Sequence, residues 1–299
     1  MSITTTTTLE AVRQEYLLAK MLEGLTSQTL GAYEEKTGRF NAYLQQVGIT
    51  DVSQVTAGDI RGYLGSLTAT CGNVTIGIHH KCLRTFFSWL LVNEYINADP
   101  MAKVAKPKEP HPYPHVLSEA ELQKLLQVAR PNPRDYSALL LLLDTGVRAS
   151  EFLALTLDDL DLRGRRLVVR CGKGQKGRAV YFSDLTARAL SRWLSVRPDS
   201  FSNALFLSQY REPLTRSGVL QLVSRLGRKA GIEGKRVSPH VIRASCASCY
   251  VQAGGDAHSL ARLLGHSSTR MAERYVSMAS DVAAEIHQRC SPVRRLHRR

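Results

Sequence analysis

The chain has 299 residues, enough for two domains, and an apolar share of 43% that is ordinary for globular proteins. Its formal net charge is +14, from 40 Lys and Arg against 26 Asp and Glu. A chain this basic commonly binds a polyanion, most often nucleic acid, although charge alone leaves open a basic surface without a ligand. No apolar run reaches the roughly 18 residues of a membrane span, so we expect no membrane contact.

The N-terminus and the cysteines indicate a cytoplasmic protein. Residues 1–8, rich in threonine, have neither the basic start nor the apolar core of a signal peptide and are predicted to be a disordered lead-in. The six cysteines show no disulfide framework and fit a reducing compartment. Cys246 and Cys249 form a Cys-x-x-Cys without a second pair. We therefore expect them to be small core residues and predict no metal and no cofactor.

Residues 9–98 show helical periodicity throughout. Four helices are predicted: Leu9 to Leu22, Ser27 to Gly48, a third that follows a capping box at Thr56 and Asp59, and a fourth capped by Asn73. Short loops join them, which predicts one compact all-α domain. Its aromatic residues recur at helical spacing and are assigned to the core rather than to base stacking: Tyr33, Phe40, Phe86, Phe87 and Trp89.

Basic side chains accompany these helices and the segment that follows. Residues 99–116 hold five prolines, which should exclude helix and stiffen a linker between domains. The basic residues either contact phosphates or belong to solvated surfaces, and the sequence leaves both readings open. The candidates for nucleic-acid contact are Arg39, Lys81, Arg84, Lys103, Lys106 and Lys108, joined later in the chain by Lys176 and Arg216.

Residues 117–280 combine helices with a short hairpin. Ser118 and Glu121 form a capping box, and a very apolar helix from Arg134 ends at Gly146, so that Arg148 lies at a helix-to-helix turn. The other predicted elements are strands at 166–171 and 179–182 around a glycine-rich hairpin, a helix from Ser183, a short strand at Leu205–Leu207, helices at 215–230 and from Pro239, and a last helix from Ser268. The expected class is therefore mainly α with a small antiparallel sheet, or α+β.

Several polar residues of this region suit chemistry on a phosphodiester. Two arginines, Arg148 and Arg243, can hold phosphate oxygens by forked hydrogen bonds. His240 is three residues before Arg243 and should share its helix face. A tyrosine such as Tyr275 can attack phosphorus, a histidine can accept its proton, and a lysine such as Lys173 can protonate the leaving oxygen. A covalent intermediate of this kind retains the bond energy, which favours rejoining over hydrolysis.

The order of these motifs resembles the tyrosine recombinase (phage integrase) family. The resemblance rests on Thr145-Gly-x-Arg148-x-x-Glu151, Gly172-Lys173-Gly-x-Lys176, His240-x-x-Arg243, and Leu264-Gly265-His266 with Tyr275 nine residues on. It covers the whole chain and implies a Xer-like or mobile-element integrase. The helical 9–98 region resembles the SAM-like core-binding domain of that family, and 117–280 its catalytic domain.

The resemblance implies a role for each matched residue. Tyr275 would be the nucleophile that forms a 3′-phosphotyrosyl bond, and Arg148 and Arg243 would clamp the phosphate. Lys173, with Lys176 as second choice, would protonate the leaving 5′-oxygen. His240 would be the acid–base partner, His266 would hydrogen-bond the phosphate, and Glu151 would orient the site. Many members have a histidine directly after the motif arginine, where this chain has Ala244.

The resemblance also implies partners. These are double-stranded DNA recombination sites near the nucleoid, a homo-tetramer that passes through a Holliday junction, and a related recombinase or accessory protein. Residues 281–299, a helix with a basic tail, would dock into a neighbouring subunit. Two alternatives are open. One is a type IB topoisomerase, which shares this chemistry but relaxes DNA as a monomer. The other is a catalytically inactive DNA-binding factor on the same scaffold, which the retained polar residues disfavour.

Overall fold

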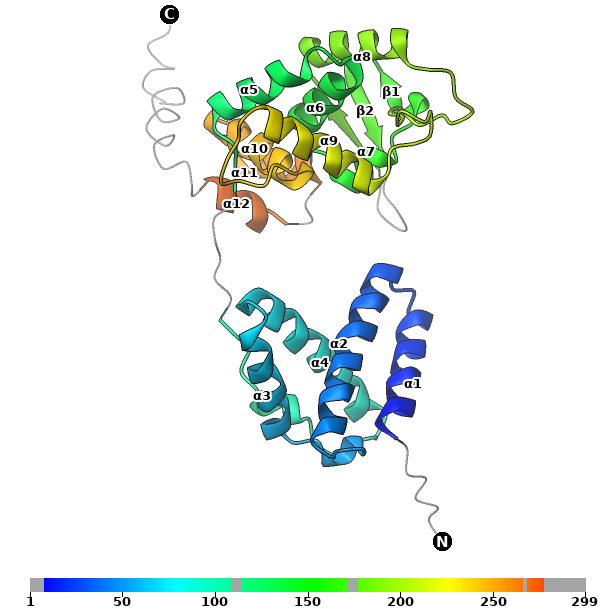
Figure 1. Cartoon of the computed structure of the whole chain (residues 1–299), viewed down its shortest axis with the longest axis vertical. Helices are drawn as coiled ribbons and strands as arrows, with labels where there is room; N and C mark the ends of the chain where they lie inside the picture. Colours follow the sequence, from blue (N-terminus) through cyan, green and yellow to red (C-terminus); the bar gives the residue numbers. More distant parts are fainter. Residues whose placement is uncertain (1–7, 109–114, 171–176, 266–267, 277–299) are drawn as a thin grey trace, which may run out of the picture. The chain divides into compact units, whose positions relative to one another are not determined.

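The computed structural model describes residues 8–108, 115–170, 177–265 and 268–276. The chain divides into two compact units at Pro112 and Tyr113. Helices dominate both units, and a three-stranded antiparallel sheet lies in the second (Figure 1). The predicted class of helices with a small antiparallel sheet is confirmed. No helix in the described ranges is long and apolar enough to cross a membrane.

Capping residues and periodicity set the helices of the N-terminal unit. These are α1 (Leu9–Leu22), α2 (Ser27–Gln46), α3 (Ala57–Ser66) and α4 (Asn73–Val92), with 3-10 turns at Val52–Gln54, Leu67–Ala69 and Pro100–Lys103. The capping box at the start of α3 is confirmed. Asp59 accepts the backbone N–H of Thr56 at 2.8 Å, and the Thr56 hydroxyl accepts the N–H of Asp59 at 3.3 Å.

Two predictions about this unit were wrong in detail. Gly72, and not Asn73, is the N-cap of α4, and the Asn73 side chain instead donates to the Lys108 carbonyl at 3.2 Å. The proline-rich segment was expected to exclude helix, yet Pro100–Lys103 forms a 3-10 turn capped by Asp99. Proline suits the first position of such a turn, where its missing N–H has no partner to lose. Met101 in this turn is buried in the N-terminal core.

The aromatic residues of the N-terminal unit form its core, as predicted. Phe40, Phe86 and Phe87 are at most 1% exposed. Tyr33 and Trp89 are half-buried and pack edge-on against the buried ring of Tyr16. Their mutual packing accounts for these rings as residues of the core and its edge.

Helix α6 forms the centre of the second unit. The helices here are α5 (Glu119–Ala129), α6 (Pro133–Thr145), α7 (Ala149–Leu153), α8 (Asp184–Val196), α9 (Arg216–Lys229), α10 (Pro239–Gln252), α11 (Ala257–Leu264) and α12 (Arg270–Val276), with a 3-10 turn at Leu157–Asp159. Helix α6 packs against α5, α8 and α10. Because it is covered from several sides, its residues 137–142 are all buried, as the unbroken apolar run Ala138 to Leu143 predicted.

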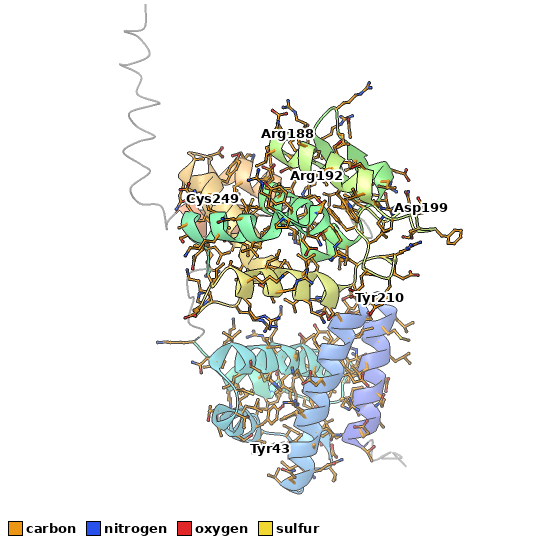
Figure 2. The ribbon with its side chains drawn as sticks, turned by 45° about the horizontal axis from the view of Figure 1, so that its top comes forward. Tyr43, Arg188, Arg192, Asp199, Tyr210 and Cys249 are labelled. Atoms are coloured by element: carbon orange, nitrogen blue, oxygen red, sulfur yellow. The ribbon has the colours of Figure 1, made fainter. Side chains whose placement is uncertain are left out.

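Helix α8 has one face exposed to solvent and one face buried in the core of this unit. Arg188 and Arg192, one turn apart, project outward from it (Figure 2). On its opposite side Leu190 and Trp193 are buried in the core, and the Trp193 indole donates to the Leu205 carbonyl at 2.9 Å. The amphipathic spacing therefore fixes which face of α8 packs against α6.

Three short strands form the sheet, in the order β1 (Leu160–Asp161), β2 (Arg166–Val169), β3 (Arg178–Tyr181). The β2–β3 register pairs Leu167 with Val180 and Val169 with Arg178. Alternate residues of β2 and β3 point into the core, so Leu167 and Val180 are almost fully buried. The separate short strand predicted at Leu205–Leu207 was wrong, because Leu207 makes only an isolated bridge to Pro213 and the preceding Ala204 one to Thr156.

A separate small cluster joins the last three described helices. These helices, α10, α11 and α12, lie side by side (Figure 1). Ala244 and Ala247 of α10, Leu260 and Leu264 of α11, and Tyr275 of α12 are buried together. The small side chains of α10 allow α12 to approach closely. Cys246 is buried and Cys249 half-buried on α10, which confirms the core role expected for Cys246. The helix predicted at 281–289 lies outside the described residues.

Candidate active site

Arg148 is held at the junction between α6 and α7. Gly146 ends α6 in the left-handed conformation, with φ 59°, which a residue with a Cβ rarely adopts. The chain then turns, and Arg148 becomes the N-cap of α7. Its backbone N–H donates to the Glu151 carboxylate at 2.8 Å, so Glu151 supplies the reciprocal half of a capping interaction.

The Glu151 carboxylate lies between two arginines. It accepts hydrogen bonds from Nη1 of Arg148 at 2.8 Å and from Nη1 and Nη2 of Arg178 at 2.9 Å each. With the Arg148 backbone N–H, four donors saturate its two oxygens. Burial alone raises the pKa of Glu151, but the hydrogen bonds and charge of Arg178 and the bonds from Arg148 outweigh it and hold the pKa at about 2. Glu151 is therefore ionised at neutral pH.

Arg148 reaches from this turn to the end of α11. Its Nη2 donates to the Gly265 carbonyl at 2.9 Å, across 117 positions of sequence. The side chain of Arg148 is 44% exposed, whereas that of Glu151 is 11% exposed. A guanidinium has five N–H donors, and the side-chain bonds to Glu151 and Gly265 use two of them, so the half-exposed Arg148 group retains further donors.

Arg243 is held in a different way, by backbone carbonyls. It lies on α10, is 8% exposed, and donates to the Leu264 carbonyl at 2.8 Å and to the Gly146 carbonyl. Burial, followed by the neighbouring charge of Arg148, lowers the pKa of Arg243 to about 10. The group still carries its charge at neutral pH, and both motif arginines are tied to the two chain reversals at Gly146 and Gly265.

Tyr275 is 7% exposed in the α10–α12 cluster. Burial raises the pKa of its phenol above the ordinary 10, while the positive charges of Arg243 and Arg274 oppose that rise. Tyr275 is buried in the same cluster as Ala244, the residue that follows Arg243 on α10. At neutral pH the phenol is protonated, so any attack by its oxygen requires a base.

His240 occupies the exposed first turn of α10, one turn before Arg243. The two residues lie three positions apart on the same helix, as expected, with Arg243 buried and His240 exposed. Lys173, Lys176 and His266 lie outside the described residues. Of the predicted set, Arg148 bonds to Glu151 and to the Gly265 carbonyl, and Arg243 bonds to the adjacent Leu264 carbonyl. Tyr275 lies in the same buried cluster as Leu264.

The remaining candidates for DNA contact are exposed, as a phosphate-binding role requires: Arg39, Lys81, Arg84, Lys103, Lys106, Lys108 and Arg216. Lys81 and Arg84 are one turn apart on α4 and line a surface hollow with Lys20. Arg39 pairs with Glu35 of the same helix at 3.3 Å, which is equally compatible with a solvated helix face.

Sequence reasoning missed Arg178, the third cation of this group. Its side chain is 15% exposed, and it follows the glycine-rich hairpin as the first residue of β3. The period of two along a strand offered a signal, because Arg178 must share the inward side with Val180. An arginine on the buried face of a strand needs a carboxylate partner, and Glu151 is that partner.

Removing the charge of Glu151 should destabilise this unit in a pH-dependent way. A pKa lowered from 4.5 to about 2 corresponds to about 3 kcal/mol, at about 1.4 kcal/mol for each tenfold change in proton affinity. This stabilisation is fully present above about pH 4.5 and is lost as the pH falls toward 2. We expect Glu151→Gln to lower the free energy of unfolding by on the order of 3 kcal/mol at pH 7, and by less than half of that at pH 3.

Urea unfolding followed by Trp193 fluorescence, in a Trp89→Phe background, measures this difference in the second unit alone. Glu233→Gln, at an exposed position, should change the free energy of unfolding by no more than about 0.5 kcal/mol. A cost for Glu151→Gln that stays constant from pH 7 to pH 3 would show that the ionised carboxylate is not its source.

A side chain at Gly265 should lower the free energy of unfolding more than one at an open glycine. It has φ 64°, and a Cβ there would lie 2.7 Å from the Arg178 guanidinium, which Glu151 and the Leu263 carbonyl hold in place. Gly231 provides a matched control, because it has φ 65° but no atom within 4 Å of such a Cβ. We expect Gly231→Ala to cost about 1 kcal/mol and Gly265→Ala at least about 1–2 kcal/mol more, by the same unfolding measurement. Equal costs would mean that the guanidinium moves aside freely.

Comparisons with known proteins identify the family. Residues 115–281 match the phage integrase family. The chain is 32% identical to tyrosine recombinase XerD of Shewanella oneidensis over 284 residues, covering 90% of this chain and 92% of the relative. It is 28% identical to XerD of Staphylococcus haemolyticus over 295 residues, covering 95% and 99%. A lambda integrase tetramer bound to a Holliday junction has the same fold, with TM-score 0.75 and 20% identity over 88% of this chain and 78% of that one. The chain therefore belongs to the phage integrase family, the site-specific tyrosine recombinases that cleave and rejoin DNA strands.

Proposed function

We propose that Tyr275 is the nucleophile of this recombinase and that Arg148 and Arg243 hold the scissile phosphate of duplex DNA. The phenolic oxygen would attack phosphorus, forming a 3′-phosphotyrosyl bond and releasing a 5′-hydroxyl. One observation carries the assignment: Arg243 donates to the carbonyls of Gly146 and Leu264, and Arg148 to that of Gly265. These bonds gather both arginines at the end of α11, next to the cluster that buries Tyr275.

The two arginines suit the charge that develops during the reaction. A phosphodiester under attack gains negative charge on its non-bridging oxygens, and preorganised cations stabilise that charge most effectively where water is excluded. Arg243 is almost fully buried and fixed by two carbonyls. Arg148 is half-exposed and fixed at one edge, so its outer donors are available to a phosphate that arrives from solvent.

Proton transfers require further groups. Because burial raises the pKa of Tyr275, its oxygen needs a base, and His240 at the exposed start of α10 is our candidate. Lys173 would protonate the leaving 5′-oxygen, with Lys176 as second choice, and His266 would hydrogen-bond the phosphate. These three assignments rest on the family motif. The phosphotyrosyl bond retains the energy of the broken phosphodiester, so rejoining needs no nucleotide cofactor.

The arrangement of the two units and of several copies on DNA is part of this proposal. We propose that the N-terminal unit is the core-binding domain, that the segment joining the two units is a linker along DNA, and that Lys81 and Arg84 contact phosphates from α4. Four copies would act on two duplex sites and pass through a Holliday junction, the arrangement named for the lambda integrase tetramer. Residues 281–299 would dock into a neighbouring subunit and couple the active sites.

Replacing Tyr275 by Phe should abolish covalent attachment to DNA, because the attacking oxygen is removed while the ring that packs in the cluster remains. The test is a nicked suicide duplex carrying the recombination site, which traps the intermediate as an SDS-resistant adduct. Wild-type protein should give the adduct and Tyr275→Phe none. Tyr250→Phe, which removes a part-buried hydroxyl bonded to Ser259, is the matched control and should retain it. An adduct in Tyr275→Phe would assign the nucleophile elsewhere.

Replacing Lys173 by Ala should slow cleavage of an ordinary phosphodiester but not of a 5′-bridging phosphorothiolate. The sulfur leaving group departs without a proton, so a missing acid no longer matters. Cleavage rates of Lys173→Ala and Lys176→Ala on the two substrates measure this. Rescue of Lys173→Ala alone assigns the acid to Lys173, whereas rescue of Lys176→Ala alone would move the role to Lys176.

A further inference from the structure

Arg178 makes more hydrogen bonds to the active-site framework than packing of β3 requires. Its two terminal nitrogens grip both oxygens of Glu151 at 2.9 Å each, and its Nε donates to the Leu263 carbonyl at 3.2 Å. All three nitrogens of the planar Arg178 guanidinium are therefore used as donors. They join β3 to the cap of α7 and to the last turn of α11.

The same guanidinium lies against the second chain reversal of the site. A Cβ on Gly265 would be 2.7 Å from it, and the Gly265 carbonyl is the acceptor of Arg148 Nη2. Arg178 thus touches the supports of Arg148 on both sides, the Glu151 carboxylate and the Gly265 turn. Arg148 itself and Arg178 share one acceptor atom, Oε1 of Glu151.

We propose that Arg178 is a positioning residue of the recombinase: by saturating Glu151 and bracing the Gly265 turn, it keeps Arg148 directed toward the scissile phosphate. The proposal rests on the proposed role of Arg148 as a phosphate clamp. Arg178 acts only through Glu151 and the α11 terminus, and no contact of its own with the phosphate is required.

The physical reason lies in competition for the Arg148 side chain. A buried carboxylate without other donors would pair with both terminal nitrogens of Arg148, since a bidentate pair is the strongest contact available to it. That pairing would turn the Arg148 donors away from solvent and from DNA. Because Arg178 already occupies both oxygens, Glu151 can offer Arg148 a single side-chain bond. A lysine at position 178 would keep the positive charge but could not bond both Glu151 oxygens with a planar pair of donors, so it would restore the arrangement only in part.

A purely structural ion pair is the competing explanation, and the chain offers a control for it. Arg225 pairs with Asp135, whose side chain is 4% exposed, and links α9 to α6 in the same unit. Arg225→Ala therefore also leaves a buried carboxylate with one cation fewer, because Arg134 still pairs with Asp135. It touches neither Arg148 nor Glu151. A general loss of stability should affect both variants alike.

The experiment compares Arg178→Ala, Arg178→Lys and Arg225→Ala on the nicked suicide duplex. DNA affinity is measured by fluorescence anisotropy, and the rate of adduct formation is measured at saturating DNA. We expect Arg178→Ala to bind DNA within about twofold of wild type but to form the adduct on the order of 100-fold more slowly, as misplaced catalytic groups do. Arg178→Lys should fall between, and Arg225→Ala should react within about threefold of wild type.

Chemical rescue separates positioning from folding. The Arg178 side chain lines a surface hollow with Asp256, Ser259 and Arg262, so a small ion can enter where the side chain was removed. Guanidinium at non-denaturing concentration should raise the rate of adduct formation by Arg178→Ala at least about tenfold. The same ion should not change the rate of Arg225→Ala.

The outcomes distinguish this proposal from the proposed function. If wild type forms the adduct and Tyr275→Phe does not, yet Arg178→Ala reacts at the wild-type rate, the positioning role is wrong and the nucleophile stands. If Arg178→Ala and Arg225→Ala are slowed equally, or if guanidinium restores nothing, Arg178 is only structural. An adduct that persists in Tyr275→Phe would overturn the proposed function, and the inference on Arg178 with it.

Discussion

The carboxylate of Glu151 accepts four hydrogen bonds, and the position of Arg148 depends on them. Two come from Arg148 itself, one from its backbone and one from its side chain, and two come from Arg178. A carboxylate this buried would normally resist ionisation, but the surrounding cations hold its pKa at about 2. The charge of Glu151 is thus permanent at physiological pH, and it partly offsets the repulsion among three neighbouring guanidinium groups.

Backbone carbonyls complete the framework. Arg243 and Arg148 donate to carbonyls at Gly146, Leu264 and Gly265, which lie where two helices end in left-handed glycines. The last carbonyls of a helix lack intrahelical partners, so they are natural acceptors for cations. The two glycines therefore do more than end helices: they turn unsatisfied carbonyls toward the site. A side chain on either glycine would meet a packed neighbour, Leu264 at one and Arg178 at the other.

Hydrophobic packing places Tyr275, the proposed nucleophile. Tyr275 belongs to the cluster that joins α10, α11 and α12, and small residues of α10 make room for its ring. The burial that fixes the ring also raises the pKa of its phenol. In the proposed role, the phenol therefore stays protonated until a base accepts its proton.

Local signals in the sequence determined most of the helices and their caps. Ser118, Ser183, Ser238 and Gly146 act on neighbours within four residues, so their effect is readable without a fold. Motif spacing likewise predicted Arg148, Glu151, Arg243 and Tyr275 as members of one site. Tertiary structure alone decided which groups those residues contact. Arg178 meets Glu151 across 27 positions and Arg243 meets Gly146 across 97, and a carbonyl acceptor is the same in every residue type. The sequence does not indicate which carbonyl will accept a hydrogen bond. Only the packing of α7, α10, α11 and β3 shows which groups become partners.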